Sequence, residues 1–255
     1  MFIDTHAHLT FPEYETDLPD VIRRAKDAKL QAIINIALDD EAIKKSLKIA
    51  KEHPDFIYTA AGLHPHEASQ WSEKVNQNIR ISGNQGKIIA IGEMGLDYHY
   101  KLSPIETQKE VFKKFLQLAQ ELDLPAVIHS REASKDTMLI IHEENQGKLK
   151  GVLHCFGGDM DLAREALEIG LLISFTGNCT FPKAHQVREA IKQIPLEKIM
   201  IETDCPFLAP QAFRGKRNEP AYVVKVAEQI AEAKGLSVEE IAKQTTKNAK
   251  NFFKI

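Results

Sequence analysis

Residues 2–9 read FIDTHAHL, an apolar segment that carries two histidines two positions apart. Short apolar segments rich in β-branched residues recur along the whole chain. Most are near-continuous hydrophobic runs, which is typical of strands buried on both faces of a parallel sheet. These segments are residues 2–8, 32–37, 57–64, 87–93, 126–130, 151–156, 171–177 and 199–204. The pattern predicts eight parallel strands.

Helical patterns separate these segments. They cover residues 17–28, 40–53, 103–122, 132–145, 159–170, 183–194, 219–235 and 237–253. Ser103 and Glu106 predict a capping box for the third of these helices, as Ser237 and Glu240 do for the last. Residues 65–86 show no clear pattern. Strands that alternate with helices predict an α/β fold, a (β/α)8 TIM barrel; a doubly wound open sheet is the alternative, although the GxGxxG fingerprint is absent.

Length and composition fit one such domain over residues 1–255. Hydrophobic residues make up 43% of the chain and charged residues 27%, which is ordinary globular usage. The formal net charge of −3 creates no global field that attracts nucleic acid, so a polyanion must be held by local cations. The three cysteines show no CxxC spacing, which suggests reduced thiols. We find no signal-peptide pattern and no long apolar run, so we expect a soluble, cytoplasmic protein without a membrane partner. A monomer is the default expectation.

Polar residues stand at the ends of several predicted strands. Residues two apart in a strand project to the same side, so His6 and His8 should point together from the end of the first strand. All strand ends of a barrel meet at one mouth, where catalytic groups lie in this fold. Imidazole and carboxylate groups are ligands of divalent metals. The predicted metal ligands are His6, His8, Glu93, His129, His154 and Asp204.

Six protein ligands exceed the needs of one open tetrahedral site, so we expect two divalent metal ions, with Glu93 as the bridging carboxylate. The competing interpretation of any one strand histidine is a hydrogen-bonded core residue. Hydrogen bonding within the core does not explain why six such groups stand at the ends of predicted strands. The donor set does not decide between Mg²⁺, Mn²⁺ and Zn²⁺.

Two further residues of the predicted mouth leave alternatives open. Glu202 lies two positions before Asp204 and should face the same interior one layer deeper. It could support a metal-ligating histidine, act as a catalytic base, or pair with a buried arginine or lysine. His64 in GLHPH could be a ligand, but a substrate-facing donor to an anion is the preferred interpretation.

The motifs FIDTHAHL, GLHPH, IGEMGLDYH, VIHSRE, GVLHCFGG and IETDCPFLAP, followed by FRGKRNEP, resemble those of the TatD family of metal-dependent deoxyribonucleases in the amidohydrolase superfamily. The resemblance runs over the whole chain, and the six predicted ligands fall on the family's metal positions. It implies a TIM-barrel hydrolase that cleaves DNA phosphodiesters through a metal-activated water, several members acting from the 3′ end of single strands. Glu93, Asp204 and Glu202 are then the expected catalytic carboxylates.

Family members differ in substrate, so a metal-dependent ester or amide hydrolase, such as a D-aminoacyl-tRNA deacylase, is the alternative. A nucleic-acid-binding protein with a vestigial metal site is a third hypothesis, which the intact ligand set disfavours. If the substrate is a single-stranded DNA end, local cations must hold it. Arg131 after the fifth strand, and Arg214 and Arg217 after the eighth, are the expected substrate-binding arginines, with aromatic residues such as Phe11 and Phe207 available for base stacking.

Overall fold

The computed structural model describes residues 1–255, and its eight strands form one parallel sheet in which each strand pairs with the next along the chain. The strands are β1 (Phe2–Ala7), β2 (Leu30–Ala37), β3 (Ile57–Ala61), β4 (Ala90–Asp97), β5 (Ala126–Arg131), β6 (Gly151–Leu153), β7 (Leu172–Phe175) and β8 (Ile199–Ile201). Strictly sequential order is that of a barrel, whereas a doubly wound sheet reverses its order at a switch point. The doubly wound alternative is therefore wrong.

The barrel closes through the residues that follow β8. Ala7 at the end of β1 makes a parallel bridge to Cys205. On either side of this bridge, the amide of Asp204 donates to the carbonyl of His6 and the amide of His8 donates to the carbonyl of Cys205, both at 2.9 Å. The seam between the first and last strands therefore consists of main-chain bonds that involve three of the predicted ligands.

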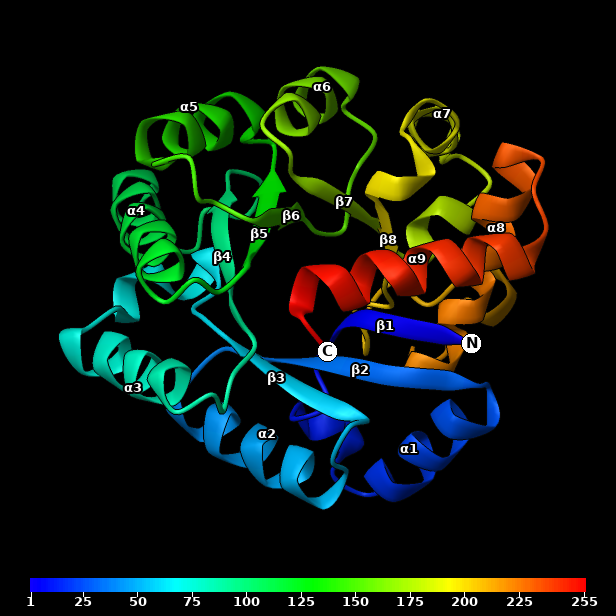
Figure 1. Cartoon of the computed structure of the whole chain (residues 1–255), viewed down its shortest axis with the longest axis horizontal. Coiled ribbons are helices and arrows are strands. Elements are labelled where there is room, and N and C mark those ends of the chain that lie inside the picture. Colours follow the sequence, from blue (N-terminus) through cyan, green and yellow to red (C-terminus); the bar gives the residue numbers. More distant parts are fainter.

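Helices form an outer ring around the strands (Figure 1). They are α1 (Leu18–Asp27), α2 (Asp40–Glu52), α3 (Glu73–Asn84), α4 (Ile105–Glu121), α5 (Ser134–Glu144), α6 (Met160–Glu168), α7 (His185–Gln193), α8 (Val223–Lys234) and α9 (Val238–Phe253). The unassigned residues 65–86 contain a short 3-10 helix, Pro65–Gln70, and α3. The Ser237–Glu240 capping box of α9 is present as predicted.

The capping box predicted at Ser103 is wrong. The helix α4 begins at Ile105 after Pro104, and Ser103 makes no cap hydrogen bond. Its buried hydroxyl instead donates to the carbonyl of His66 and accepts from the amide of Ser69. Ser103 therefore connects the loop after β3 to the loop after β4 through hydrogen bonds. This contact joins distant residues, so the local sequence pattern could not predict it.

Two hydrophobic layers surround the strands. Along β2, Ile33 and Ala37 belong to the large core between barrel and helices, whereas Ala32, Ile34 and Ile36 belong to a smaller core of 12 residues. This alternation is the period of two expected for a strand in a barrel. The smaller core also contains Ala249, Phe252 and Phe253 of α9. The last helix therefore supplies aromatic side chains to the barrel interior.

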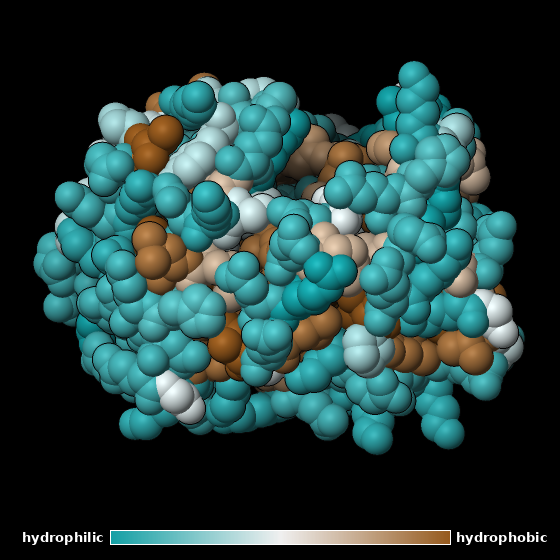
Figure 2. Space-filling view, turned by 90° about the horizontal axis from the view of Figure 1, so that it is seen from above, coloured by the Kyte–Doolittle hydropathy of each residue, from teal (hydrophilic) through white to brown (hydrophobic).

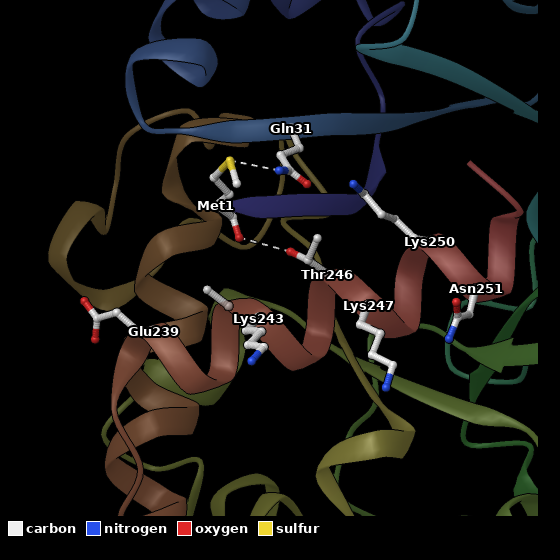
Figure 3. Close-up of a pocket in the computed structure, with 9 residues that line it drawn as sticks. Met1, Gln31, Glu239, Lys243, Thr246, Lys247, Lys250 and Asn251 are labelled. Atoms are coloured by element: carbon white, nitrogen blue, oxygen red, sulfur yellow. Dashed lines mark hydrogen bonds between the residues drawn. The ribbon is translucent and has the colours of Figure 1, made fainter.

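The helix α9 lies across the end of the barrel where the strands begin. The Thr246 hydroxyl donates to the carbonyl of Met1, just before β1 (Figure 3). The amide of Asn248 donates to the carbonyls of Leu196 and Ile199 at the start of β8. The opposite end, where the strands finish, is left for the polar residues of the predicted mouth.

The outer surface is mostly hydrophilic on the face shown in Figure 2, where hydrophobic residues form separate patches. This matches the amphipathic patterns of the outer helices. No helix combines the length and the apolar character that a membrane crossing requires.

The phenylalanines that α9 contributes to the barrel interior should be a major source of the protein's stability. Phe253 is 3% exposed, so Phe253→Ala should lower the free energy of unfolding by about 3–5 kcal/mol through lost burial and the cavity left behind. Ile81→Ala on α3, where the side chain is 50% exposed, is the matched control and should change it by about 0.5 kcal/mol or less. Urea unfolding followed by circular dichroism measures both. Equal midpoints for the two variants would contradict this role of α9.

Candidate metal centre

Glu93 reaches the mouth of the barrel from the middle of β4, not from its end as predicted, because β4 continues to Asp97. The pairing of β4 with β5 shifts register between Ile91 and Met94, a bulge that redirects the intervening residues. The flanking glycines permit this path. Gly92 has a φ of +138°, and a Cβ there would lie 2.5 Å from the carbonyl oxygen of Val127. The segment IGEMG thus places a carboxylate between strands that only glycine lets come so close.

One oxygen of Glu93 faces a first set of donor atoms. The Nε2 atoms of His6 and His8 lie 3.2 Å apart, and Glu93 Oε2 lies 3.3 Å from the former and 3.9 Å from the latter. Oδ1 of Asp204 completes this set at 3.6 Å from His6 Nε2 and 3.4 Å from His8 Nε2. Side chains from β1 and the residue after it, from β4, and from the segment after β8 therefore lie close together.

The other oxygen of Glu93 faces a second set. Oε1 lies 2.8 Å from His129 Nδ1 and 2.7 Å from His154 Nε2, and these nitrogens are 3.2 Å apart. His154 comes just after β6, so this set joins β4, β5 and β6. The structure thus brings all six predicted ligands together, with Glu93 between two groups of nitrogens.

Both sets have the separations that divalent metal binding requires. Ligand atoms at about 2.0–2.2 Å from one ion lie roughly 3.0–3.6 Å from each other in tetrahedral or octahedral geometry. Most of the separations above fall in or near this range, and the donors are imidazole nitrogens and carboxylate oxygens. The chemistry and spacing of these residues therefore fit divalent ions.

Hydrogen bonds orient the histidines of the second set. His154 directs Nδ1 toward Glu202 Oε1 at 3.3 Å, and His129 directs Nε2 toward Asp97 Oδ2 at 3.3 Å. Each imidazole that donates a proton to a carboxylate leaves its other nitrogen free to bind a metal. Glu202 is fixed in turn by the amide of Cys155 at 2.7 Å. Its contacts are those of a residue that positions His154, and it forms no ion pair with an arginine or lysine.

The first set lacks such partners. The Nδ1 atoms of His6 and His8 are buried and make no hydrogen bond. Their rings are held by packing: His6 stacks on His154 with ring centroids 4.1 Å apart, and His8 stacks on Phe11 at 4.7 Å. The two sets are therefore supported by different means.

Electrostatics hold Glu93 in its charged form. Burial alone raises its pKa, but the neighbouring imidazoles of His154, His64 and His129 outweigh this and lower the pKa well below the usual value. Burial likewise lowers the pKa of His154, and Glu93 and Glu202 outweigh it, so that this pKa is well above the usual value. The lowered pKa of Glu93 and the raised pKa of His154 have the same cause, the close contact of 2.7 Å between the two side chains.

His64 lies beside the second set as a neutral donor. Its Nδ1 accepts from the amide of His66, so its proton is on Nε2, which lies 3.4 Å from Glu93 Oε1. Burial lowers the pKa of His64 to about 3. This tautomer favours the interpretation of His64 as a hydrogen-bond donor over a metal ligand.

The three predicted substrate-binding arginines differ in whether a carboxylate pairs with them. Arg131 and Arg214 are exposed, lie over the rings of Tyr100 and Phe181, and form no ion pair. Arg217 makes a two-bond ion pair with Asp17, at 2.7 and 2.8 Å. The structure therefore does not leave Arg217 free for an anion. The sequence shows a cluster of basic residues in the loop after β8, but it does not show which of these arginines has a carboxylate partner.

Sequence reasoning missed two buried aspartates. Asp97 is 1% exposed, and its Oδ2 accepts from both His129 and His66. Asp4 is fully buried beneath the seam, where it accepts from the amide and hydroxyl of Thr203. Burial raises the pKa of Asp4 to about 8. Both aspartates stand in the motifs quoted above, and Asp4 falls in a predicted buried strand, but their partners Thr203, His66 and His129 lie far along the chain.

The opposite end of the barrel carries a groove of about 460 Å³ between α9 and the start of β2 (Figure 3). It is lined by three lysines, Lys243, Lys247 and Lys250, and one carboxylate, Glu239. With no histidine and a single acid, this groove cannot form a comparable metal site. The candidate centre is therefore the cluster at the mouth.

Comparison with known proteins decides the family. The sequence pattern of the family described as TatD related DNase matches residues 3–254. The chain belongs to this family. It is 47% identical over 255 residues, the full length of both chains, to the uncharacterized metal-dependent hydrolase YabD of Bacillus subtilis (strain 168). The protein is accordingly a metal-dependent hydrolase of the TatD family.

More distant relatives agree. The 3′-5′ ssDNA/RNA exonuclease TatD of Pantoea vagans (strain C9-1) is 33% identical over 258 residues, which cover 99% of each chain. Among solved structures, that of the TatD homolog YjjV from Escherichia coli K12 superimposes with a TM-score of 0.92 at 28% identity, covering 100% of this chain and 98% of the other. The TIM-barrel prediction and the TatD resemblance are confirmed.

The contacts of Glu202 predict its role in metal binding. Glu202→Gln should weaken divalent metal binding by about 10- to 100-fold, because His154 loses the carboxylate that orients it. Isothermal titration of metal-free protein with Mn²⁺ measures the affinity. Glu197→Gln, at an exposed position, is the control and should bind as wild type does. Unchanged affinity with lost activity would instead indicate that Glu202 is a catalytic base.

Metal binding should release protons. His154 has a raised pKa, so it retains a proton above the ordinary histidine value of about 6.5, and a cation must displace that proton. Affinity for Mn²⁺ should therefore rise with pH and continue to rise above about 6.5, until the raised pKa of His154 is passed. Titrations in buffers of different ionisation enthalpy count the released protons. An affinity that does not change with pH would contradict this protonation state.

Proposed function

We propose that this protein hydrolyses phosphodiester bonds at the ends of single-stranded DNA, as a 3′-5′ exonuclease with two divalent metal ions. The observation that carries the proposal is Glu93, whose two oxygens face two separate sets of nitrogens at the mouth of the barrel. A carboxylate in this position is suited to bridge a pair of ions. In-line displacement at phosphorus is a reaction that such paired sites support, since charge develops on both the attacking and the leaving oxygen.

The chain's own residues would hold and orient the reactants. His6, His8 and Asp204 hold one side of the centre and His129 and His154 the other, with Glu93 shared between them. Bound there, divalent ions supply Lewis-acid polarisation of the phosphoryl group and lower the pKa of water. Most of these side chains are buried, which would strengthen their electrostatic interactions with a bound phosphate.

Among the site carboxylates, Asp204 is the best placed to accept the proton of the attacking water. Its side chain is 15% exposed, compared with 4% for Glu93 and 1% for Glu202. The first set lowers the pKa of Asp204: burial opposes this, but His8 and His6 outweigh it. Asp204 is therefore ionised at neutral pH and accessible from the mouth.

Donors around the centre would orient the phosphate. His64 presents a neutral N–H beside Glu93, and the unpaired guanidinium groups of Arg131 and Arg214 remain exposed. So few cations suit a substrate held at one end, because binding along a duplex would need many phosphate contacts. Similarity to the 3′-5′ ssDNA/RNA exonuclease TatD supports the same substrate class.

The test uses metal-stripped protein and end-labelled single-stranded DNA, with Mg²⁺, Mn²⁺ or Zn²⁺ restored separately. Wild type should release mononucleotides only with metal, and Glu93→Gln should reduce the rate by at least about 100-fold because both sets lose their shared anion. The Glu93 variant also serves as the control for contaminating nuclease, and Glu106→Gln, at an exposed position on α4, is the matched control that should keep wild-type activity.

Other substrates separate the alternatives. A strict exonuclease should leave circular single-stranded DNA intact, and efficient cleavage of circles would exclude that version. If wild type and Glu93→Gln are equally inactive on DNA with every metal, the phosphodiester proposal fails. Metal-dependent hydrolysis of aminoacyl esters on tRNA would then favour the deacylase alternative.

A further inference from the structure

Two aromatic side chains stand at the rim of the mouth beside the first set of donors. Phe11 follows β1 and Phe207 follows β8, and their ring centroids lie 5.9 Å apart in an edge-to-face arrangement. Phe11 stacks on His8, and the Phe207 centroid lies 6.5 Å from that of His8. Phe207 is 50% exposed. An aromatic face is therefore open to solvent next to a predicted metal ligand.

The turn that carries Phe207 is held by a buried side chain. Asn218 is fully buried, and its amide donates to the carbonyls of Thr203 at 2.9 Å and of Phe207 at 2.6 Å. Its main-chain amide donates to the carbonyl of Pro206, and its carbonyl accepts from the Tyr14 hydroxyl. Asn218 thus fixes the main chain of residues 203–207.

A fixed main chain beneath an exposed ring has a physical consequence. Exposing a large apolar ring to water is unfavourable, and a rigid turn cannot fold the ring away. The same rigidity lowers the entropic cost of binding, because the main chain that carries the ring is already ordered. The position is adjacent to Asp204, which the same turn carries, so a ligand on the ring and a phosphate at the centre are neighbours.

We propose that Phe207, supported by Phe11, is the surface on which the nucleobase next to the scissile phosphate stacks. The proposal rests on the phosphodiesterase function proposed above and specifies its substrate as a nucleotide with an unpaired base. Stacking is tolerant of base identity, since every base has a π face. In a duplex, pairing and stacking hold every base in the helix, and only the outer face of a terminal pair is open, so this surface favours an unpaired base at a single-stranded end.

A double-mutant cycle tests the contact. One partner is removed with Phe207→Leu and the other with oligonucleotides that carry a single abasic site at the terminal or the penultimate nucleotide. With wild type, loss of the base at one of these positions should lower kcat/KM roughly tenfold, the scale of a base–aromatic stack. Phe207→Leu should lose about as much on the normal oligonucleotide and little more on the abasic one.

Matched variants isolate the ring. Phe207→Tyr keeps an aromatic face and should retain the discrimination between normal and abasic substrates. Phe213→Leu is the control, because Phe213 lies in the same loop but stacks on Tyr222 at 3.8 Å and not at the mouth. It should discriminate as wild type does. Titration with Mn²⁺ should give wild-type affinity for Phe207→Leu, which shows that the metal centre is intact.

Full discrimination against the abasic substrate in Phe207→Leu would overturn the proposal. So would a wild type that cleaves normal and abasic oligonucleotides equally well, although the proposed nuclease function would then stand. If wild type cleaves neither oligonucleotide with any metal, the proposed function is wrong, and so is this inference, which rests on it. The three results are distinguishable in one set of assays.

Discussion

The hydrogen bonds that close the barrel depend on the same residues as the metal centre. The Asp204 amide binds the carbonyl of His6, and the His8 amide binds the carbonyl of Cys205, so three donors of the first set lie on the seam itself. Strand closure fixes their main chains, which places the side chains at one mouth without a dedicated loop. Asp4 and Asn218 strengthen this seam from beneath, since each is buried and each hydrogen-bonds around Thr203.

The two halves of the centre show different ways to hold a histidine. On the β4–β6 side, Glu202 and Asp97 orient His154 and His129 through hydrogen bonds. On the seam side, His6 and His8 have no partner for Nδ1 and are held by ring packing and by the main chain. Supporting carboxylates therefore surround the second set, whereas ring contacts support the first. The aromatic rim at Phe11 continues these ring contacts to the surface.

Much of this arrangement could be predicted from the sequence, because it depends on the spacing of apolar residues and on where polar residues fall along the strands. Buried strands separated by helices implied the barrel, and polar residues at strand ends implied a common mouth. What could not be predicted depends on contacts between distant segments. The bulge that brings Glu93 to the mouth depends on how β4 approaches β5, and the pairing of Arg217 with Asp17 joins residues 200 positions apart. Ser103 has the pattern of a helix cap and serves a neighbouring loop instead.

The sharing of Glu93 makes its two neighbouring sets a single thermodynamic unit. In the proposed two-ion centre, a cation in one set would draw on the charge of the carboxylate that the other set also uses, so the occupancy of each set would change the affinity of the other. Linkage requires the two effects to be equal in free energy, whichever set fills first. Loading of the centre is then described by a coupling free energy between the sets as well as by two separate affinities. In such a centre, a substitution that weakens cation binding in one set would also change cation binding in the other.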